Sequence, residues 1–400
     1  MTKHAVVCGG SIGGLFVAAA LRRHGWSVEV LERSAVPLSG RGAGIVTHPE
    51  LVSALDYVGA DTRDLGVELH ERVAYDLAGA RVHAFDFHQV VTSWDRMYRV
   101  LRALIPDRAY RLGVNVTGYD DGGQRPAAIL ADGSLVEADV VIGADGFRSA
   151  IRGQMLPSVQ PDYSGYVVWR TVASELAFPD HLKADIFKTF GFFIPNGTQI
   201  IGYPIAGDGN DLRPGNLRYN FVWYAEAPED ALDRMLTDTD GRRHRLSIPP
   251  PLVRQDVIDA AMADAEARLP APFVEILKVS ERPFFTPIYD HHSPQMAQGR
   301  VAISGDAACV ARPHVGMGVT KAAGDALALA RHLDSGAVEE ALAGYSDERV
   351  PASRIAYETS QWLGALIFAG DRSKNQDGRS HAQIEAVMRE TAVVPGALRD

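Results

Sequence analysis

The chain has 400 residues, of which 46% are hydrophobic and 22% are charged, and its formal net charge is −10. This length favours two folded domains, and an acidic balance without basic runs argues against nucleic acid as a partner. The two cysteines, Cys8 and Cys309, exclude a disulfide framework and predict buried thiols in a reduced, cytoplasmic protein. The N-terminal KHAVVCGG lacks the apolar core of a signal peptide, and no apolar stretch approaches the roughly 18 residues of a membrane helix. We therefore expect no membrane association, and no cysteine-rich metal motif is present.

The first elements along the chain predict a βαβ unit. Residues 4–8, HAVVC, are typical of a short buried strand. A helix is expected to begin near Gly13 and to end at Gly25, where glycine suits a helix C-terminus. Residues 27–31 predict a second strand, which ends at Glu32.

The loop inside this unit, GGSIGG, indicates nucleotide binding. It keeps Gly9 and Gly14 of the dinucleotide fingerprint but carries Ser11 in the middle glycine position. The amides that open the following helix are expected to face phosphate groups, and the Glu32 carboxylate is expected to face ribose hydroxyls.

The rest of the chain predicts an interrupted α/β fold. Residues 138–142 and 300–304 are short apolar strands that run into GADGFRS and GDAA, as expected for neighbours of the first strand in one sheet. Between them, residues 164–173, 189–205 and 217–225 are rich in aromatic and β-branched residues and predict an antiparallel sheet.

The fold class that follows is a Rossmann-like α/β nucleotide-binding domain interrupted by a β-rich substrate domain. A helical segment is expected over residues 322–364, followed by a polar tail at 371–380. The expected limits are 1–70, 97–160 and 286–350 for the nucleotide-binding domain, 71–96 and 161–285 for the β-rich domain, and 351–400 for a C-terminal helical segment and tail.

Three motifs carry a family resemblance. They are GRGAGI at 40–45, DVVIGADGFRSAIR at 139–152 and GDAACVARPHVGMG at 305–318. In this order they resemble the FAD-dependent aromatic hydroxylases of the p-hydroxybenzoate hydroxylase type. The resemblance implies FAD, transient binding of NADH or NADPH, and hydroxylation of an aromatic substrate with O2 through a flavin C4a-hydroperoxide. The resemblance does not decide whether the protein is a monomer or a homodimer.

The resemblance also implies site residues. The FAD-binding residues would be Gly9, Ser11, Gly14, Glu32, Arg33, Gly44, Asp145, Gly146, Asp306, Pro313, Gly316 and Gly318, with Ser149 and Arg152 supporting the second motif. Asp306 could instead only cap the helix that follows.

Two positions depart from the family pattern. Trp94, Met97 and Leu101 occupy a frame in which many members begin with an FAD-contacting arginine. Arg96 could replace that arginine or could be a solvated helix charge. Cys309 stands where a histidine is frequent, and we interpret it as a packing residue.

Four shorter stretches are similar to the hydroxypyridine hydroxylases, such as 2,6-dihydroxypyridine 3-hydroxylase. They are GGSI, PLSG-x-G-x-GIV, YVVWR and RPH. This similarity implies a hydroxypyridine substrate and a substrate-facing His314 that accepts a proton from the ring hydroxyl or holds its anion. An unperturbed imidazole titrates near pH 6.5, which suits a base at neutral pH. Tyr203 and His48 are the next candidates for ring contacts, although a glutamine is expected in place of His48.

Several alternatives remain open at this point. Trp169, Phe221 and Trp223 could face a planar ring, but alternation along a strand would send many such side chains into the core. His314 could merely stiffen its turn. The chain could be an FAD oxidase that makes peroxide without hydroxylation, or a nucleotide-binding protein without catalysis.

Overall fold

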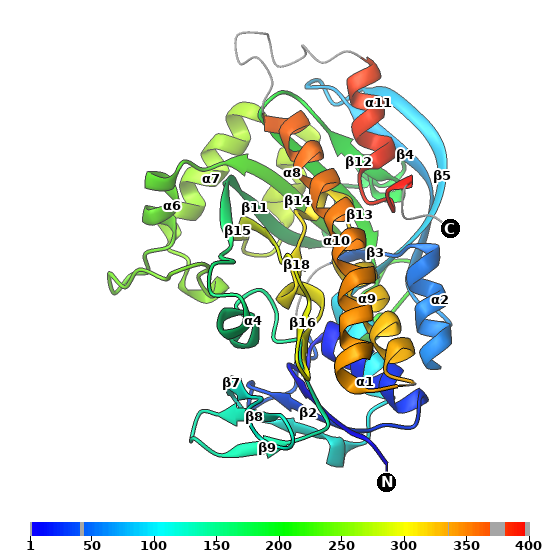
Figure 1. The fold of residues 1–400 in the computed structure, drawn as a ribbon. Coiled ribbons are helices and arrows are strands. Elements are labelled where there is room, and N and C mark those ends of the chain that lie inside the picture. Colours follow the sequence, from blue (N-terminus) through cyan, green and yellow to red (C-terminus); the bar gives the residue numbers. More distant parts are fainter. Residues whose placement is uncertain (1, 41–43, 335, 369–380, 397–400) are drawn as a thin grey trace.

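The structure is a computed structural model that describes residues 2–40, 44–334, 336–368 and 381–396. It contains a mostly parallel sheet near the N-terminus and a larger, mainly antiparallel sheet, with the long helix α10 running alongside both (Figure 1). The expected class, a Rossmann-like α/β domain interrupted by a β-rich domain, is confirmed.

The first sheet has six strands in the order β16-β17-β10-β1-β2-β6. Its strands are β1 His4–Cys8, β2 Ser27–Glu32, β6 Tyr110–Leu112, β10 Val140–Gly143, β16 Ala297–Gln298 and β17 Val301–Ile303. All pairs are parallel except β16 with β17. The carboxyl ends of β1, β10 and β17 therefore meet at one edge, where each runs into a glycine-containing turn.

The turn between β1 and α1 (Ile12–Arg23) is built on close backbone approach. Gly9 has a φ of 110°, which favours glycine. A Cβ atom on Gly14 would lie 1.9 Å from the carbonyl oxygen of Gly9, so only glycine fits beneath the turn. The helix ends as expected before Gly25, whose φ is 80°.

The second sheet has nine strands in the order β18-β15-β11-β14-β13-β12-β4-β5-β3. Its strands are β3 Gly44–Val46, β4 Val67–Tyr75, β5 Arg81–Ser93, β11 Asp162–Ser174, β12 Phe190–Phe193, β13 Thr198–Ile205, β14 Arg218–Glu226, β15 Phe284–His292 and β18 Cys309–Val310. The expected antiparallel pairing holds for β11, β12, β13 and β14. A separate three-stranded sheet contains β7 Val116–Asp120, β8 Ala127–Leu130 and β9 Leu135–Glu137.

Helices cover both sheets. The remaining helices are α2 Pro49–Val58, α3 Trp94–Arg102, α4 Ala150–Met155, α5 Asp180–Lys183, α6 Glu229–Met235, α7 Gln255–Arg268, α8 Ala271–Val279, α9 Gly318–His332, α10 Val338–Phe368 and α11 His381–Glu390. The segment expected to be helical over 322–364 is two helices, because a turn that includes Gly336 with a φ of 85° separates α9 from α10. No helix in the described ranges is long and apolar enough to cross a bilayer.

The C-terminal part of the chain returns to the larger sheet. Helix α11 packs against β4 and β5, far along the sequence from either strand (Figure 1). The polar tail expected at 371–380 lies outside the described residues, as do residues 41–43 of the GRGAGI motif. The domain limits stay a prediction, and α10 continues through Pro351, where the third segment was expected to begin.

Substitution of Gly14 by alanine tests the first turn. The added methyl group would meet the Gly9 carbonyl, so we expect Gly14→Ala to lower the free energy of unfolding by roughly 1–3 kcal/mol. The matched control is Gly13→Ala, whose Cβ would lie 3.6 Å from the Ala322 side chain, an ordinary contact. Urea denaturation of both variants measures the difference, and equal stability of the two would contradict this account of the turn.

Candidate active site

Three adjoining cavities run from the first glycine loop to the larger sheet. The outer cavity, about 900 Å³, is bordered by that loop, the end of β2 and the turn after β10. The middle cavity, about 510 Å³, lies between the N-terminus of α1 and the turn after β17. The inner cavity, about 250 Å³, lies between the larger sheet and residues 310–319. Ser11 and Gly146 border the outer and middle cavities, while Arg170 and Asp306 border the middle and inner ones, so the three form one extended channel.

The structure brings the expected cofactor residues to this channel with one exception. Gly14 lies beneath the first turn rather than on a cavity wall. The residues that border a cavity are Gly9, Ser11, Glu32, Arg33, Gly44, Asp145, Gly146, Asp306, Pro313, Gly316 and Gly318.

Glu32 is fixed at the end of β2 by two backbone donors. Its carboxylate oxygens accept hydrogen bonds from the N–H groups of Gly10 and Ser34, each at 2.8 Å. The side chain is only 7% exposed, and it borders the outer cavity beside Arg33. A carboxylate has about four lone-pair positions, so it retains acceptors for two hydroxyl groups.

The N-terminus of α1 and Asp145 supply polar groups without protein partners to the channel. Ser11, Ile12 and Gly13 border the middle cavity, and the Ser11 side chain makes no capping bond to its own helix. The first amides of a helix have no intrahelical acceptor, so they attract anions. Asp145 accepts the N–H of Ala150 at 2.7 Å, while its second oxygen is buried and finds no hydrogen-bond partner within the described ranges.

Ser149 and Arg152 hold the second motif from behind. The Ser149 hydroxyl accepts the N–H of Arg152 at 2.8 Å and so caps α4. The Arg152 guanidinium is buried and donates to the carbonyl oxygens of Phe147 and Ala307. Neither residue borders a cavity of the channel, so their expected support of the motif acts through the fold.

A buried charge cluster fixes the turn that carries Asp306. Asp325, fully buried on α9, accepts the N–H of Gly305 at 3.0 Å and pairs with Arg349 at 2.9 Å. Lys321 donates to the carbonyl oxygen of Gly305 at 2.8 Å. The Asp306 carboxylate is exposed to the channel, and because the channel lies deep between protein elements, desolvation raises the pKa of this carboxyl. Within the described chain it makes no capping bond to the following helix.

Trp94 replaces the family arginine at the channel wall. Its side chain borders the outer and middle cavities and stacks on Tyr98, with ring centroids 5.3 Å apart. Arg96 instead donates to the carbonyl oxygen of Arg63 at 2.6 Å and borders neither cavity. Arg96 therefore does not take over the position of the missing arginine.

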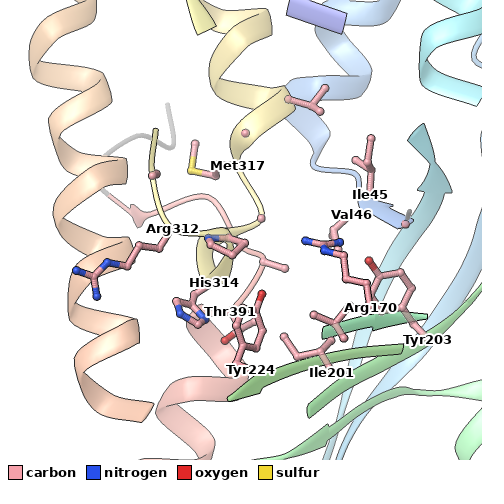
Figure 2. Close-up of a pocket in the computed structure, with 18 of the residues that line it drawn as sticks. Ile45, Val46, Arg170, Ile201, Tyr203, Tyr224, Arg312, His314, Met317 and Thr391 are labelled. Atoms are coloured by element: carbon pink, nitrogen blue, oxygen red, sulfur yellow. The ribbon is translucent and has the colours of Figure 1, made fainter. Parts of the chain in front are cut away.

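The inner cavity has a sheet wall and a loop wall (Figure 2). Arg170 on β11, Ile201 and Tyr203 on β13, and Val222 and Tyr224 on β14 form the sheet wall, since residues two apart on a strand share a face. The loop wall consists of residues 310–319. Arg170 and Tyr203 lie on one side of the cavity, with His314 and Tyr224 on the other.

His314 is buried on the loop wall and belongs to a polar chain. Its Nε2 atom lies 2.8 Å from the Tyr166 hydroxyl, and its ring centroid lies 4.6 Å from that of Tyr224. Its Nδ1 atom is buried and has no hydrogen-bond partner in the part of the chain that the structure describes. Burial, and then the charge of Arg312, lower the pKa of His314 to about 3. The expectation of an unperturbed imidazole near pH 6.5 was therefore wrong, because a fully buried ring has no water to stabilise its charged form.

Comparisons with known proteins agree with this geometry. A model described as "FAD binding domain-like" matches residues 163–290, and an "FAD binding domain" model matches residues 278–360. The 2,6-dihydroxypyridine 3-monooxygenase of Paenarthrobacter nicotinovorans is 35% identical over 338 residues, which cover 82% of each chain. The chain belongs to the FAD-dependent aromatic monooxygenases.

Two further relatives extend the comparison. The 6-hydroxynicotinate 3-monooxygenase of Pseudomonas fluorescens is 28% identical over 346 residues, 82% of this chain and 81% of that one. The solved structure of 2,6-dihydroxypyridine-3-hydroxylase from Arthrobacter nicotinovorans matches with a TM-score of 0.86 and 30% identity, over 95% of this chain and 99% of that one.

Tyr203 and His48, the two other expected ring contacts of this monooxygenase, lie in different places. Tyr203 borders the inner cavity and stacks on Phe190, with centroids 4.8 Å apart, and burial raises the pKa of its hydroxyl. His48 does not border the channel: it occupies the N-cap position of α2 without a side-chain capping bond, and its Nδ1 atom lies 2.7 Å from the Thr320 hydroxyl on α9. The expected contact of His48 with the ring is not supported, since the imidazole is turned toward that helix.

Of the aromatic residues in the larger sheet, Trp169, Phe221 and Trp223 pack in the core on its other face. Cys8 and Cys309 are buried and free, and burial raises the pKa of both thiols. Cys309 therefore packs, as expected.

Sequence reasoning missed three residues of the inner cavity and its surroundings. Arg170 ends the quoted YVVWR stretch, and a lone arginine in an apolar strand was a usable signal. Tyr224 follows Trp223, and when two successive strand residues are both aromatic the sequence does not show which of them faces the cavity. Tyr166 begins YVVWR, and its contact with His314 spans two distant segments.

Acid should destabilise the enzyme through its buried histidines. The pKa of His314 is about 3 when folded and near 6.5 when unfolded, so only the unfolded chain gains this proton between those values. The free energy of unfolding should then fall by up to about 1.4 kcal/mol per pH unit for this group as the pH drops from 6.5 toward 3. Urea denaturation at several pH values should show a shallower slope for His314→Gln. The exposed His88→Gln is the control, and an unchanged slope in His314→Gln would contradict the prediction.

Proposed function

We propose that this FAD-dependent monooxygenase uses NADH or NADPH and O2 to hydroxylate a small hydroxypyridine in the inner cavity. The observation that carries the proposal is that the channel ends in a small cavity in which apolar side chains lie between the buried His314 on one side and Arg170 on the other. The relatives named for 2,6-dihydroxypyridine and 6-hydroxynicotinate support a pyridine ring.

The residues along the channel fit FAD in an extended conformation. Glu32 would hold the ribose hydroxyls, the α1 amides with Ser11 would hold the diphosphate, and Asp306 would hold the ribityl chain. A Cβ on Gly318 would meet no atom within 4 Å, so the chain leaves room for a flat ring there. When bound, FAD supplies the redox and oxygen chemistry. In the part of the chain that the structure describes there is one βαβ nucleotide fold, so the nicotinamide nucleotide would visit transiently.

The polar chain behind His314 sets the position of its proton. Arg312 pairs with the buried Asp290 at 2.5 Å and lies beside the Tyr166 hydroxyl. The positive charge of Arg312 favours the Tyr166 oxygen, and not its hydrogen, on the guanidinium side, so the hydroxyl would direct its hydrogen to Nε2 of His314, 2.8 Å away. His314 then carries its proton on Nδ1.

His314 therefore acts as a neutral hydrogen-bond donor to a ring oxygen. Of the two roles considered from the sequence, this geometry favours holding the substrate anion over accepting a proton, because a buried imidazolium is costly. Arg170 stands on the opposite side with no hydrogen bond or ion pair to the described residues, and its positive charge would favour an ionised ring. An ionised ring hydroxyl makes the ring a better nucleophile.

Turnover with two rings tests the function. We expect 2,6-dihydroxypyridine to stimulate NADH or NADPH oxidation more than p-hydroxybenzoate does and to yield a hydroxylated product by mass spectrometry. A higher rate with the benzoate would remove the pyridine assignment. Peroxide equal to the NADH consumed, with no hydroxylated product from any ring, would instead support an FAD oxidase. Light scattering of the holoenzyme tests whether it is a homodimer.

Loss of the Asp306 carboxylate should weaken FAD binding. A hydrogen bond to a charged group contributes about 1.5–3 kcal/mol, so we expect Asp306→Ala to raise the FAD dissociation constant roughly tenfold to a hundredfold. The exposed Asp230→Ala, on α6, is the control. Flavin fluorescence during titration gives both constants. Unchanged FAD affinity together with lower stability would indicate a purely structural role.

Loss of the His314 ring should uncouple the reaction. The variant His314→Ala is expected to retain FAD and accept hydride, but to form more peroxide and less hydroxylated product. The defect should shrink at high pH, where the substrate ionises without help. Oxygen and product measurements from pH 6 to 9 test this, and wild-type coupling across that range would show that His314 is structural.

A further inference from the structure

The C-terminal end of the described chain closes the inner cavity. Thr391 and Ala392, which directly follow α11, border the cavity together with strands that lie far earlier in the sequence. The Ala392 N–H donates to the His314 carbonyl oxygen at 2.8 Å, and a Cβ on Gly316 would lie 2.9 Å from the Ala392 Cα atom. This segment, 391–394, is therefore docked on the loop that carries His314, and we call it the C-terminal strap.

Arg72 on β4 holds the strap in place. Its buried guanidinium donates to the carbonyl oxygens of Met388, Thr391 and Ala392. It also donates to Gln89, and it lies 3.9 Å from the centroid of the Phe87 ring. Among the described residues these donors go to carbonyl and amide oxygens and not to a carboxylate. Undocking the strap would take the Thr391 and Ala392 carbonyl acceptors from the guanidinium, which favours the docked position.

The docked strap places a second unsatisfied polar group at the cavity. The Thr391 hydroxyl is fully buried and has no hydrogen-bond partner among the described residues, and the same holds for Nδ1 of His314. Both residues border the inner cavity, and Figure 2 shows them with Tyr224 on the side opposite Arg170. Buried polar atoms in folded proteins are usually paired, and these two unpaired atoms belong to residues that border the same cavity, so we take them as the groups that a bound ring would pair with.

We propose that Thr391 recognises the ring nitrogen of the substrate while His314 binds the adjacent ring oxygen. The inference rests on the proposed function and deepens it. A hydroxypyridine in its lactam form presents an acceptor oxygen beside a donor N–H. The His314 Nδ1–H supplies the matching donor, and the Thr391 hydroxyl supplies the matching acceptor. Thr391 thereby becomes a specificity residue that distinguishes a pyridine from a benzene ring of the same shape.

The matched probes are 2,6-dihydroxypyridine and resorcinol, which carry the same two hydroxyl groups and differ in the ring nitrogen. The variant Thr391→Val removes the hydroxyl and keeps the side-chain shape, and Thr391→Ser keeps the hydroxyl. Dissociation constants come from the change in flavin absorbance when each ring is added to the FAD-loaded enzyme. Steady-state KM and kcat with 2,6-dihydroxypyridine accompany them.

The expected result is a selective loss. Thr391→Val should bind 2,6-dihydroxypyridine roughly fivefold to tenfold more weakly, the worth of one neutral hydrogen bond, and should bind resorcinol within about twofold of wild type. Thr391→Ser should retain most of the preference. Because the hydroxyl is unpaired before the ring binds, Thr391→Val should not lower the melting temperature of the substrate-free enzyme.

Several results would overturn the inference. One is equal weakening of both rings by Thr391→Val, and another is wild-type affinity of that variant for 2,6-dihydroxypyridine. A third is a wild-type enzyme that binds the two rings equally well. Failure of the proposed function is distinguishable, because then neither ring would stimulate NADH or NADPH oxidation in the wild-type enzyme itself.

Discussion

The ion pair between Asp290 and Arg312 connects the parts that shape the inner cavity. Asp290 lies near the end of β15 and is only 2% exposed, and it accepts hydrogen bonds from Arg312 at 2.5 Å, from Tyr357 at 3.3 Å and from Gln361 at 3.4 Å. One buried carboxylate thus joins the larger sheet, the loop before α9 and the long helix α10. The loop that carries His314 is thereby held at a fixed distance from the sheet that carries Tyr203 and Tyr224.

The same logic of buried, satisfied charge recurs along the channel. Lys321, Asp325 and Arg349 fix the Gly305–Asp306 turn from α9 and α10, and Glu32 is fixed by backbone amides at the opposite end. Asp306 and the Ser11 side chain, by contrast, face the channel without such partners. One set of polar groups thus fixes the backbone around the channel, and a second set is left to bind FAD and the ring. Such a division is typical of a preorganised site, in which the binding groups are already held in position.

The sequence was most informative where backbone geometry dictates the residue. Gly9 and Gly14 predicted the first turn because a side chain would collide with the backbone there. The short apolar runs predicted the strand that ends at Glu32 and the strand that precedes Asp306. It was least informative where contacts join distant segments. His48 was expected to contact the ring, but its imidazole is hydrogen-bonded to Thr320 on α9 and does not border the inner cavity.

Tyr224 and Thr391 show two further limits of sequence reasoning. When a strand carries aromatic residues at successive positions, the sequence pattern does not show which of them faces the cavity. Trp223 was a candidate for a ring contact, but it packs in the core, and Tyr224 borders the cavity instead. Thr391 follows a short C-terminal helix that no motif connects to the cavity, and only the docking on Arg72 brings it there. The lowered pKa of His314 likewise depends on complete burial, a property of the whole fold.

The central claim is that His314 is a neutral donor whose proton is placed on Nδ1 by Arg312 and Tyr166. The most direct measurement is ¹⁵N NMR of the histidine rings in the FAD-loaded enzyme, with the His314→Gln variant used to assign the signal. The account predicts a neutral ring with a protonated Nδ1 and an unprotonated Nε2 throughout pH 5 to 8. A ring that gains a second proton in that range, or a neutral ring protonated on Nε2, would contradict it.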